Sequence, residues 1–168
     1  MGICEADLER LHRVNQELDR RWRQWWVFRS AVEGGDPRRQ LANAVELQVM
    51  WRLEERGHLA VRQRHKAHFD LNVQGVRVEV KVSRWDGSRY EANLHNNEAD
   101  VLVFGCLDGD VHFFVMPFEQ VAGRTVIKVP CHDPRDYARW TMFYENWELV
   151  DELVRAGRNP WQLSLWGG

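Results

Sequence analysis

Residues 69–82 contain the pattern that most constrains the fold. Every second residue from 76 to 82 is a valine, and polar residues stand between the valines. This period-two alternation is typical of a strand with one buried face. Leu71 and Val73 alternate in the same way on the other side of Gln74-Gly75, where glycine permits a positive φ. The segment therefore predicts a β-hairpin with a two-residue loop.

The predicted register of this hairpin brings three charged side chains together. A loop at residues 74–75 fixes the pairing so that Asp70 lies opposite Glu79, and Lys81 shares the face of Glu79, opposite the valines. Directly opposed carboxylates destabilise a sheet, so a compensating charge is expected. A divalent cation is the simplest candidate. A solvated, charged hairpin face is the alternative interpretation.

Asp70 followed by Glu79-Val80-Lys81 after a turn resembles the core motif of the PD-(D/E)XK nuclease superfamily. That superfamily usually adds a glutamate on the preceding helix, and Glu46 stands in the corresponding place. Phe69 stands where the family often has proline, at a position that varies among its members. The resemblance covers roughly residues 38 to 130, most of one domain. It is closest to the branch of group I intron homing endonucleases and restriction-endonuclease-like members, and less close to archaeal Holliday-junction resolvases.

This resemblance implies a metal-dependent endonuclease that hydrolyses phosphodiester bonds in double-stranded or branched DNA. Asp70, Glu79 and Glu46 would then bind Mg²⁺, for which Mn²⁺ is a substitute, because oxygen ligands suit such ions. The metal would polarise the scissile phosphate and activate a water. Lys81 would orient that water or stabilise charge on the phosphate. The choice among homing, restriction and resolvase roles stays open, because it depends on what the loops read.

Basic and polar side chains on both sides of the motif are candidate DNA contacts. The basic residues before Asp70, namely Arg62, Arg64 and Lys66, would form a basic rim that binds phosphates. A solvated loop is the alternative interpretation of these residues. Those after the motif fall in predicted loops, and Trp85 is the candidate for stacking on unpaired bases. The candidate DNA-binding residues are Arg62, Arg64, Lys66, Ser83, Arg84, Trp85 and Asn96.

A second class of function is compatible with the same residues. A non-catalytic DNA-binding or assembly protein that keeps the nuclease fold would use the basic rim without a working metal site. Carboxylates that lie far apart, or a Lys81 that turns to the valine side, would favour this alternative.

Composition sets broad limits on these interpretations. The chain has 168 residues, of which 44% are hydrophobic and 29% charged, as in ordinary globular domains. No apolar run of about 18 residues is present, and the N-terminus lacks the features of a signal peptide, so we expect a cytoplasmic protein with no membrane partner. The net charge of −2 does not exclude DNA, because carboxylates can gather at a metal and arginines along a groove. The three cysteines form no C-x-x-C pair, which argues against a disulfide framework or structural zinc.

The order of predicted elements indicates an α+β, restriction-endonuclease-like fold with a central mixed sheet flanked by helices. Residues 1–35 are predicted as an N-terminal helical extension, and residues 36–168 as the nuclease domain with C-terminal helices. Residues 89–98 are ambiguous between a loop and a short helix. The other predicted segments are helices at 5–33, 36–56 and 147–155, a helical segment from 134, and strands at 59–61, 71–73, 76–82, 101–106, 111–116 and 125–129.

The predicted N-terminal helix leads us to expect a homodimer or higher homo-oligomer. Trp22, Trp25 and Phe28 provide more aromatic surface than a small sheet easily buries, and large apolar patches usually mark partner surfaces. Light scattering at micromolar concentration should therefore give a mass of at least two chains. A monomer under these conditions would contradict the expectation.

Overall fold

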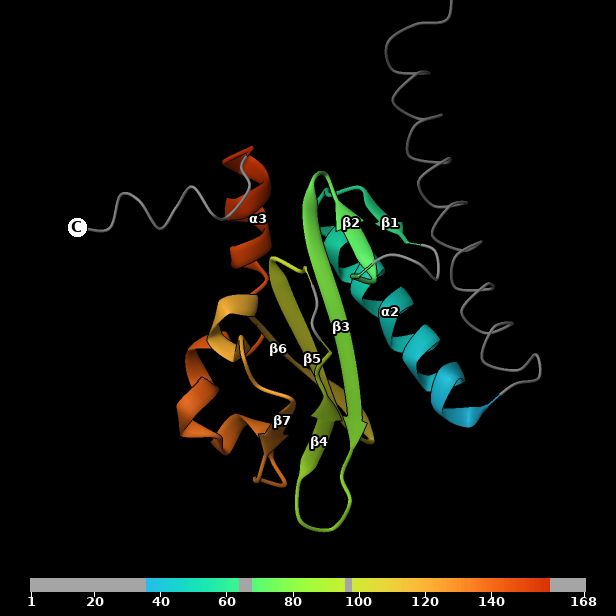
Figure 1. Ribbon diagram of the computed structural model, residues 1–168, viewed down its shortest axis with the longest axis vertical. Helices are drawn as coiled ribbons and strands as arrows, with labels where there is room; N and C mark the ends of the chain where they lie inside the picture. The colour runs from blue at the N-terminus through green and yellow to red at the C-terminus, as the bar shows by residue number, and fades with distance from the viewer. Residues whose placement is uncertain (1–35, 64–67, 96–97, 158–168) are drawn as a thin grey trace, which may run out of the picture. The chain divides into compact units, whose positions relative to one another are not determined.

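The computed structural model describes residues 36–63, 68–95 and 98–157 (Figure 1). The chain divides into two units, Met1–Ala44 and Val45–Gly168, and the second unit contains the sheet and the candidate site. The predicted helix at 5–33 and its part in self-association lie outside the described residues, and both stay predictions. No helix in the described ranges is long and apolar enough to cross a membrane.

Five strands form one mixed sheet in the order β1-β2-β3-β5-β6. Strands β3 and β5 run parallel, and the other neighbouring pairs run antiparallel. A second sheet has two antiparallel strands, β4 and β7. The strand bounds are β1 (Ala60–Arg62), β2 (Leu71–Val73), β3 (Val76–Arg84), β4 (Tyr90–Asn93), β5 (Val101–Asp108), β6 (Asp110–Pro117) and β7 (Val126–Val129).

In the part of the chain that the structure describes, two α-helices and three short 3₁₀ helices accompany these strands. Helix α2 begins where the sequence predicts, because Asp36 accepts a hydrogen bond from the Arg38 amide at 3.0 Å and Pro37 follows as the first helical residue. The helix bounds are α2 (Pro37–Glu55), η1 (Phe118–Val121), η2 (Pro134–Asp136), η3 (Ala138–Phe143) and α3 (Glu148–Arg155). The mixed central sheet with its helices confirms the predicted α+β class.

One face of the large sheet carries the valines of β3. Gly105 of β5 pairs with Val82 and with Phe113 of β6, so the three lie on this face. A side chain at Gly105 would meet the Val45 Cγ1 atom of α2 at 3.5 Å, which shows how closely this part of α2 covers the sheet. The ring centroids of Phe113 and Trp147 are 5.4 Å apart, so the chain leading into α3 packs on the same face.

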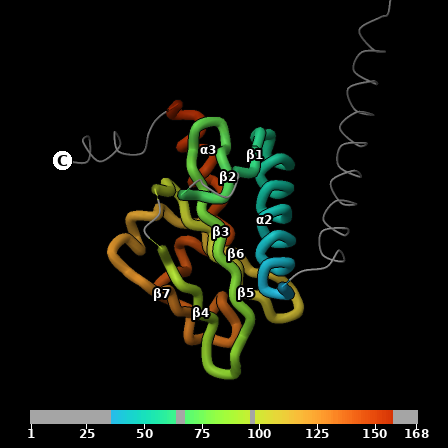
Figure 2. The backbone as a smooth tube through the Cα atoms, turned by 45° about the vertical axis from the view of Figure 1, so that its right-hand side comes forward, coloured from blue at the N-terminus to red at the C-terminus, as the bar shows by residue number. Residues whose placement is uncertain are grey.

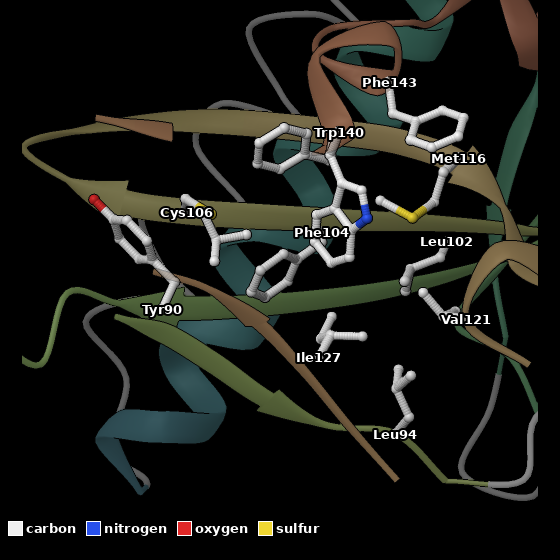
Figure 3. Close-up of a cluster of buried hydrophobic side chains, with 12 residues drawn as sticks. Tyr90, Leu94, Leu102, Phe104, Cys106, Met116, Val121, Ile127, Trp140 and Phe143 are labelled. Carbon is white, nitrogen blue, oxygen red and sulfur yellow. The ribbon is translucent and has the colours of Figure 1, made fainter. Parts of the chain in front are cut away.

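The opposite face is buried by a separate hydrophobic cluster (Figure 3). Alternate residues of β5 and β6 meet residues of β4, β7 and η3 there, and Tyr90 and Ile127 point from the small sheet toward Phe104 and Cys106. The labelled members are Tyr90, Leu94, Leu102, Phe104, Cys106, Met116, Val121, Ile127, Trp140 and Phe143. The small sheet is thus fixed to one face of the large sheet by its apolar side.

The hairpin of β2 and β3 has the predicted loop and register. Val73 pairs with Val76, and Leu71 pairs with Val78. Gln74 and Gly75 have φ values of 52° and 99°, as the type I′ turn requires. These pairings confirm the register on which the predicted meeting of Asp70 with Glu79 depends.

The prediction of a loop or short helix within residues 89–98 is wrong for Tyr90–Asn93, which form strand β4. The local sequence has little strand character, and the strand exists because it pairs with β7 from Val129 to Val126 while Tyr90 is fully buried. Figure 2 shows the two strands side by side, next to the end of β3. Tertiary pairing has overridden weak local propensity here.

Candidate active site

Asp70 lies at the point where β2 separates from β3. The first paired residue of β2 is Leu71, one position later. The Asp70 amide donates to the Val78 carbonyl at 3.0 Å, and its carboxylate Oδ2 accepts from the Val80 amide at 2.8 Å. The carboxylate therefore takes the place of a partner strand at this β3 amide. This bond fixes the side chain at the edge that the departing strand leaves open.

Glu79 and Lys81 lie on the face of β3 opposite its valines, as predicted. Glu79 is only 4% exposed, and Lys81 Nζ forms an ion pair with Glu79 Oε1. Burying a carboxylate is costly unless it is paired with a charge or well hydrogen-bonded. This degree of burial disfavours the interpretation of the motif as a solvated hairpin face.

Glu46 reaches the same region from α2. Its side chain is 12% exposed, and its Oε2 atom lies 2.7 Å from Arg62 Nε on β1. Burial raises the pKa of Glu46 to about 7, the Arg62 charge opposes that rise, and the charges of Asp70 and Glu79 add to it. Glu46 therefore interacts electrostatically with carboxylates from two other segments of the chain.

The carboxylates of this region are chemically suited to a hard divalent cation. Mg²⁺ binds through one or two carboxylates and completes its shell with water and phosphate oxygens. In the described ranges, no group of three or more His, Cys, Asp or Glu side chains is arranged to hold a metal ion. Arg62 and Lys81 occupy the positions of counter-ions to Glu46 and Glu79. Asp70, Glu79 and Glu46 all carry the oxygen donors that such a cation prefers, and both Glu79 and Glu46 are engaged by a cationic side chain.

The predicted DNA contacts have differing surroundings. Arg62 binds Glu46, so it belongs to the carboxylate cluster as well as to the predicted rim. Ser83 is structural, because its hydroxyl accepts from the Glu91 amide at 2.9 Å and attaches β4 to the end of β3. Arg84 is exposed. The predicted contacts Arg64, Lys66 and Asn96 lie outside the described residues.

Trp85 is half-buried and packs against the hydrophobic cluster. Its ring centroid lies 5.2 Å from that of Tyr90 and 5.1 Å from that of His132. A ring held by these neighbours must leave them before it can stack on a base. The structure thus gives Trp85 a packing role that the sequence pattern does not reveal.

Comparison of folds gives an informative similarity. No protein-family model matches this sequence, and no curated protein matches it either. The solved structure of a bacterial homing endonuclease, I-Ssp6803I, superposes with a TM-score of 0.59 at 18% sequence identity. The match covers 70% of this chain and 95% of that chain. The chain has a homing-endonuclease-like fold.

The perturbed Glu46 predicts how stability depends on pH. Its pKa in the folded protein, about 7, lies above the value near 4.3 of an unfolded glutamate. The folded state binds more protons between these values, so this group's contribution to stability is present at low pH and is lost as pH rises through 7. Glu46→Gln has no titrating carboxyl at this position, so the fall in stability with rising pH that Glu46 causes should be absent. Without metal, the variant should gain at most roughly 3 kcal/mol relative to the natural protein between pH 5 and pH 8.

Urea unfolding at both pH values, with chelator present, measures this difference. Glu55→Gln, an exposed residue of the same helix, is the matched control and should follow the natural protein at both pH values. Equal stability changes for the two variants would show that the Glu46 carboxyl does not titrate abnormally.

Proposed function

We propose that the protein is a metal-dependent endonuclease of the PD-(D/E)XK kind that hydrolyses phosphodiester bonds in double-stranded or branched DNA. The observation that carries this proposal is the electrostatic interaction of Glu46 with Asp70 and with Glu79, together with the ion pair of Glu79 and Lys81. A buried site with excess carboxylate charge is what a divalent cation and a phosphate substrate require. The homing-endonuclease-like fold supports the proposal.

Each side chain has a distinct task in this proposal. Asp70 and Glu79 hold the cation, which is Mg²⁺ or Mn²⁺, and Glu46 completes the site directly or through a water. The bound metal supplies polarisation of the phosphate and a lowered pKa of the attacking water. Lys81, 22% exposed and fixed by Glu79, orients that water or stabilises negative charge on the phosphate.

The proposed partners are DNA and further copies of the same chain. One such site cuts one strand, so cutting both strands of a symmetric target requires two copies. A homodimer or higher homo-oligomer supplies these copies, and a cytoplasmic location gives access to DNA.

A non-catalytic DNA-binding or assembly protein with this fold is the second candidate. The pairing of Glu46 with Arg62 and of Glu79 with Lys81 favours it, because both carboxylates already have a cationic partner. The two candidates differ in whether the carboxylates exchange these partners for a divalent cation.

Titration calorimetry with Mn²⁺ distinguishes the candidates without a DNA substrate. The natural protein should bind Mn²⁺, and Glu79→Gln should weaken binding by on the order of tenfold or more, since a charged ligand is lost. Glu152→Gln, an exposed carboxylate of α3, serves as the matched control and should bind like the natural protein. Absence of Mn²⁺ binding by the natural protein would support the non-catalytic candidate.

A further inference from the structure

The small sheet of β4 and β7, called the ribbon below, has one apolar and one polar face. Tyr90, Ile127 and Val129 are fully buried against the large sheet (Figure 3). The alternate residues face outward, where Glu91 pairs with Lys128 and Asn93 pairs with Val126. The apolar face anchors the ribbon to the large sheet, and the polar residues are presented on the outward face.

The outward face carries an ordered charge cluster. Glu91 Oε2 lies 2.7 Å from Arg89 Nε and 3.2 Å from Lys128 Nζ. The Arg89 and Lys128 side chains are 44% and 52% exposed. One carboxylate thus positions two accessible cations on the surface of the ribbon.

Two further polar side chains belong to this surface. Asn93 and Arg124 are both exposed. Arg124 precedes β7 closely in the chain and adds positive charge at the Asn93 end, because Asn93 pairs with Val126. The surface therefore has three cations for two carboxylates, because Asp86 Oδ2 also lies 3.9 Å from Arg89 Nε.

The ribbon stands on the side of the large sheet that carries the candidate active site. Lys81 pairs with Phe104, which packs in the same cluster as Tyr90 and Ile127. Ser83, two residues beyond Lys81 and thus about 7 Å along the strand, accepts a hydrogen bond from the Glu91 amide. A DNA duplex placed against Lys81 would therefore also meet the ribbon.

We propose that the ribbon reads DNA sequence by entering the major groove next to the phosphate that is cut, an inference that rests on the proposed function. The major groove accepts a two-stranded β-ribbon, and the outward residues have the chemistry of base edges: asparagine recognises adenine, lysine recognises guanine and glutamate accepts from cytosine. Arg89 and Arg124 at its margins bind phosphates. The excess of positive charge on this surface matches DNA.

Selection from a random duplex library tests the proposal. The full-length natural protein is incubated with the library in Ca²⁺, so that binding is measured without cleavage, and the bound duplexes are sequenced. The double variant Asn93→Ala, Lys128→Ala should lose the preference at one or more positions by on the order of tenfold. Arg124→Ala should weaken binding to all duplexes alike and reduce its salt dependence.

Arg155→Ala is the matched control, because Arg155 is an exposed cation on α3. Trp147, which directly precedes α3, packs on the valine face of the large sheet, whereas the ribbon packs on the opposite face. Arg155→Ala should leave the selected sequences unchanged. An unchanged preference in the folded double variant would overturn the ribbon proposal while leaving the nuclease proposal intact. A natural protein that binds duplexes without preferring any sequence would also overturn the ribbon proposal. A natural protein that binds no duplex would count against both the ribbon proposal and the nuclease proposal.

Discussion

Replacing Asp70 with asparagine should abolish detectable DNA cleavage, a reduction on the order of 10²–10³-fold or more. The substitution removes the negative charge with which Asp70 would bind the cation, but it preserves the size of the side chain. The fold should persist, because an amide oxygen can still accept the hydrogen bond that Asp70 receives from the Val80 amide. The rate of plasmid nicking in Mg²⁺ and the free energy of unfolding are the two measurements.

Asp70→Ala provides the contrasting variant. It removes the acceptor for the Val80 amide as well as the charge, so it should be inactive and also less stable, by about 1–3 kcal/mol. Normal cleavage by Asp70→Asn would remove Asp70 from the proposed ligands. Loss of folding in that variant would show that the carboxylate charge itself is structural.

Replacing Lys81 with alanine should reduce turnover by on the order of 10²-fold or more, as loss of a preorganised charge-stabilising group does. Binding of uncleaved DNA in Ca²⁺ should change little, because phosphate contacts elsewhere supply most of the affinity. The ion pair with Glu79 is lost in the variant, so stability must be measured in parallel.

Lys81→Arg is the matched control, since it keeps the positive charge beside Glu79 and should retain stability. Its turnover should lie between those of the natural protein and of Lys81→Ala, because the charge is kept but its position differs. Equal losses of binding and turnover in Lys81→Ala would instead assign Lys81 to DNA contact.

Arg62→Ala should weaken DNA binding if Arg62 acts on phosphates, and its pairing with Glu46 predicts an added fall in stability.

The hairpin could be predicted from the sequence because its rules are local. The valine alternation and Gln74-Gly75 determine the register, and with it the shared face of Glu79 and Lys81. The ion pair of Glu46 with Arg62 has no such local signal, since it depends on how α2 meets the edge of the sheet. In the sequence, Arg62 is one of several basic residues before Asp70, and no local pattern marks it as the partner of Glu46.

Strand β4 shows the same limit for the fold. Tyr90–Asn93 form a strand only through pairing with β7, more than 30 residues later in the chain. For this reason the sequence does not mark the outward residues of the ribbon as candidate DNA contacts, although it does mark Ser83 and Arg84 next to it. Trp85 shows the same limit for side-chain packing, because a tryptophan beside the motif suggests base stacking, whereas its contacts with Tyr90 and His132 have no local sequence signal. Its stacking on DNA bases stays a prediction.

Incubation of the purified natural protein with supercoiled plasmid and with branched DNA is the most direct test of the nuclease proposal. The reaction is run with Mg²⁺ and, in parallel, with a chelator, and Asp70→Asn is included to exclude a contaminating nuclease. Cleavage of either DNA in Mg²⁺, its absence in chelator and its absence in the variant are the predicted results. No cleavage of either DNA in Mg²⁺ or Mn²⁺, or equal cleavage by Asp70→Asn, would contradict the assignment of catalysis to this site.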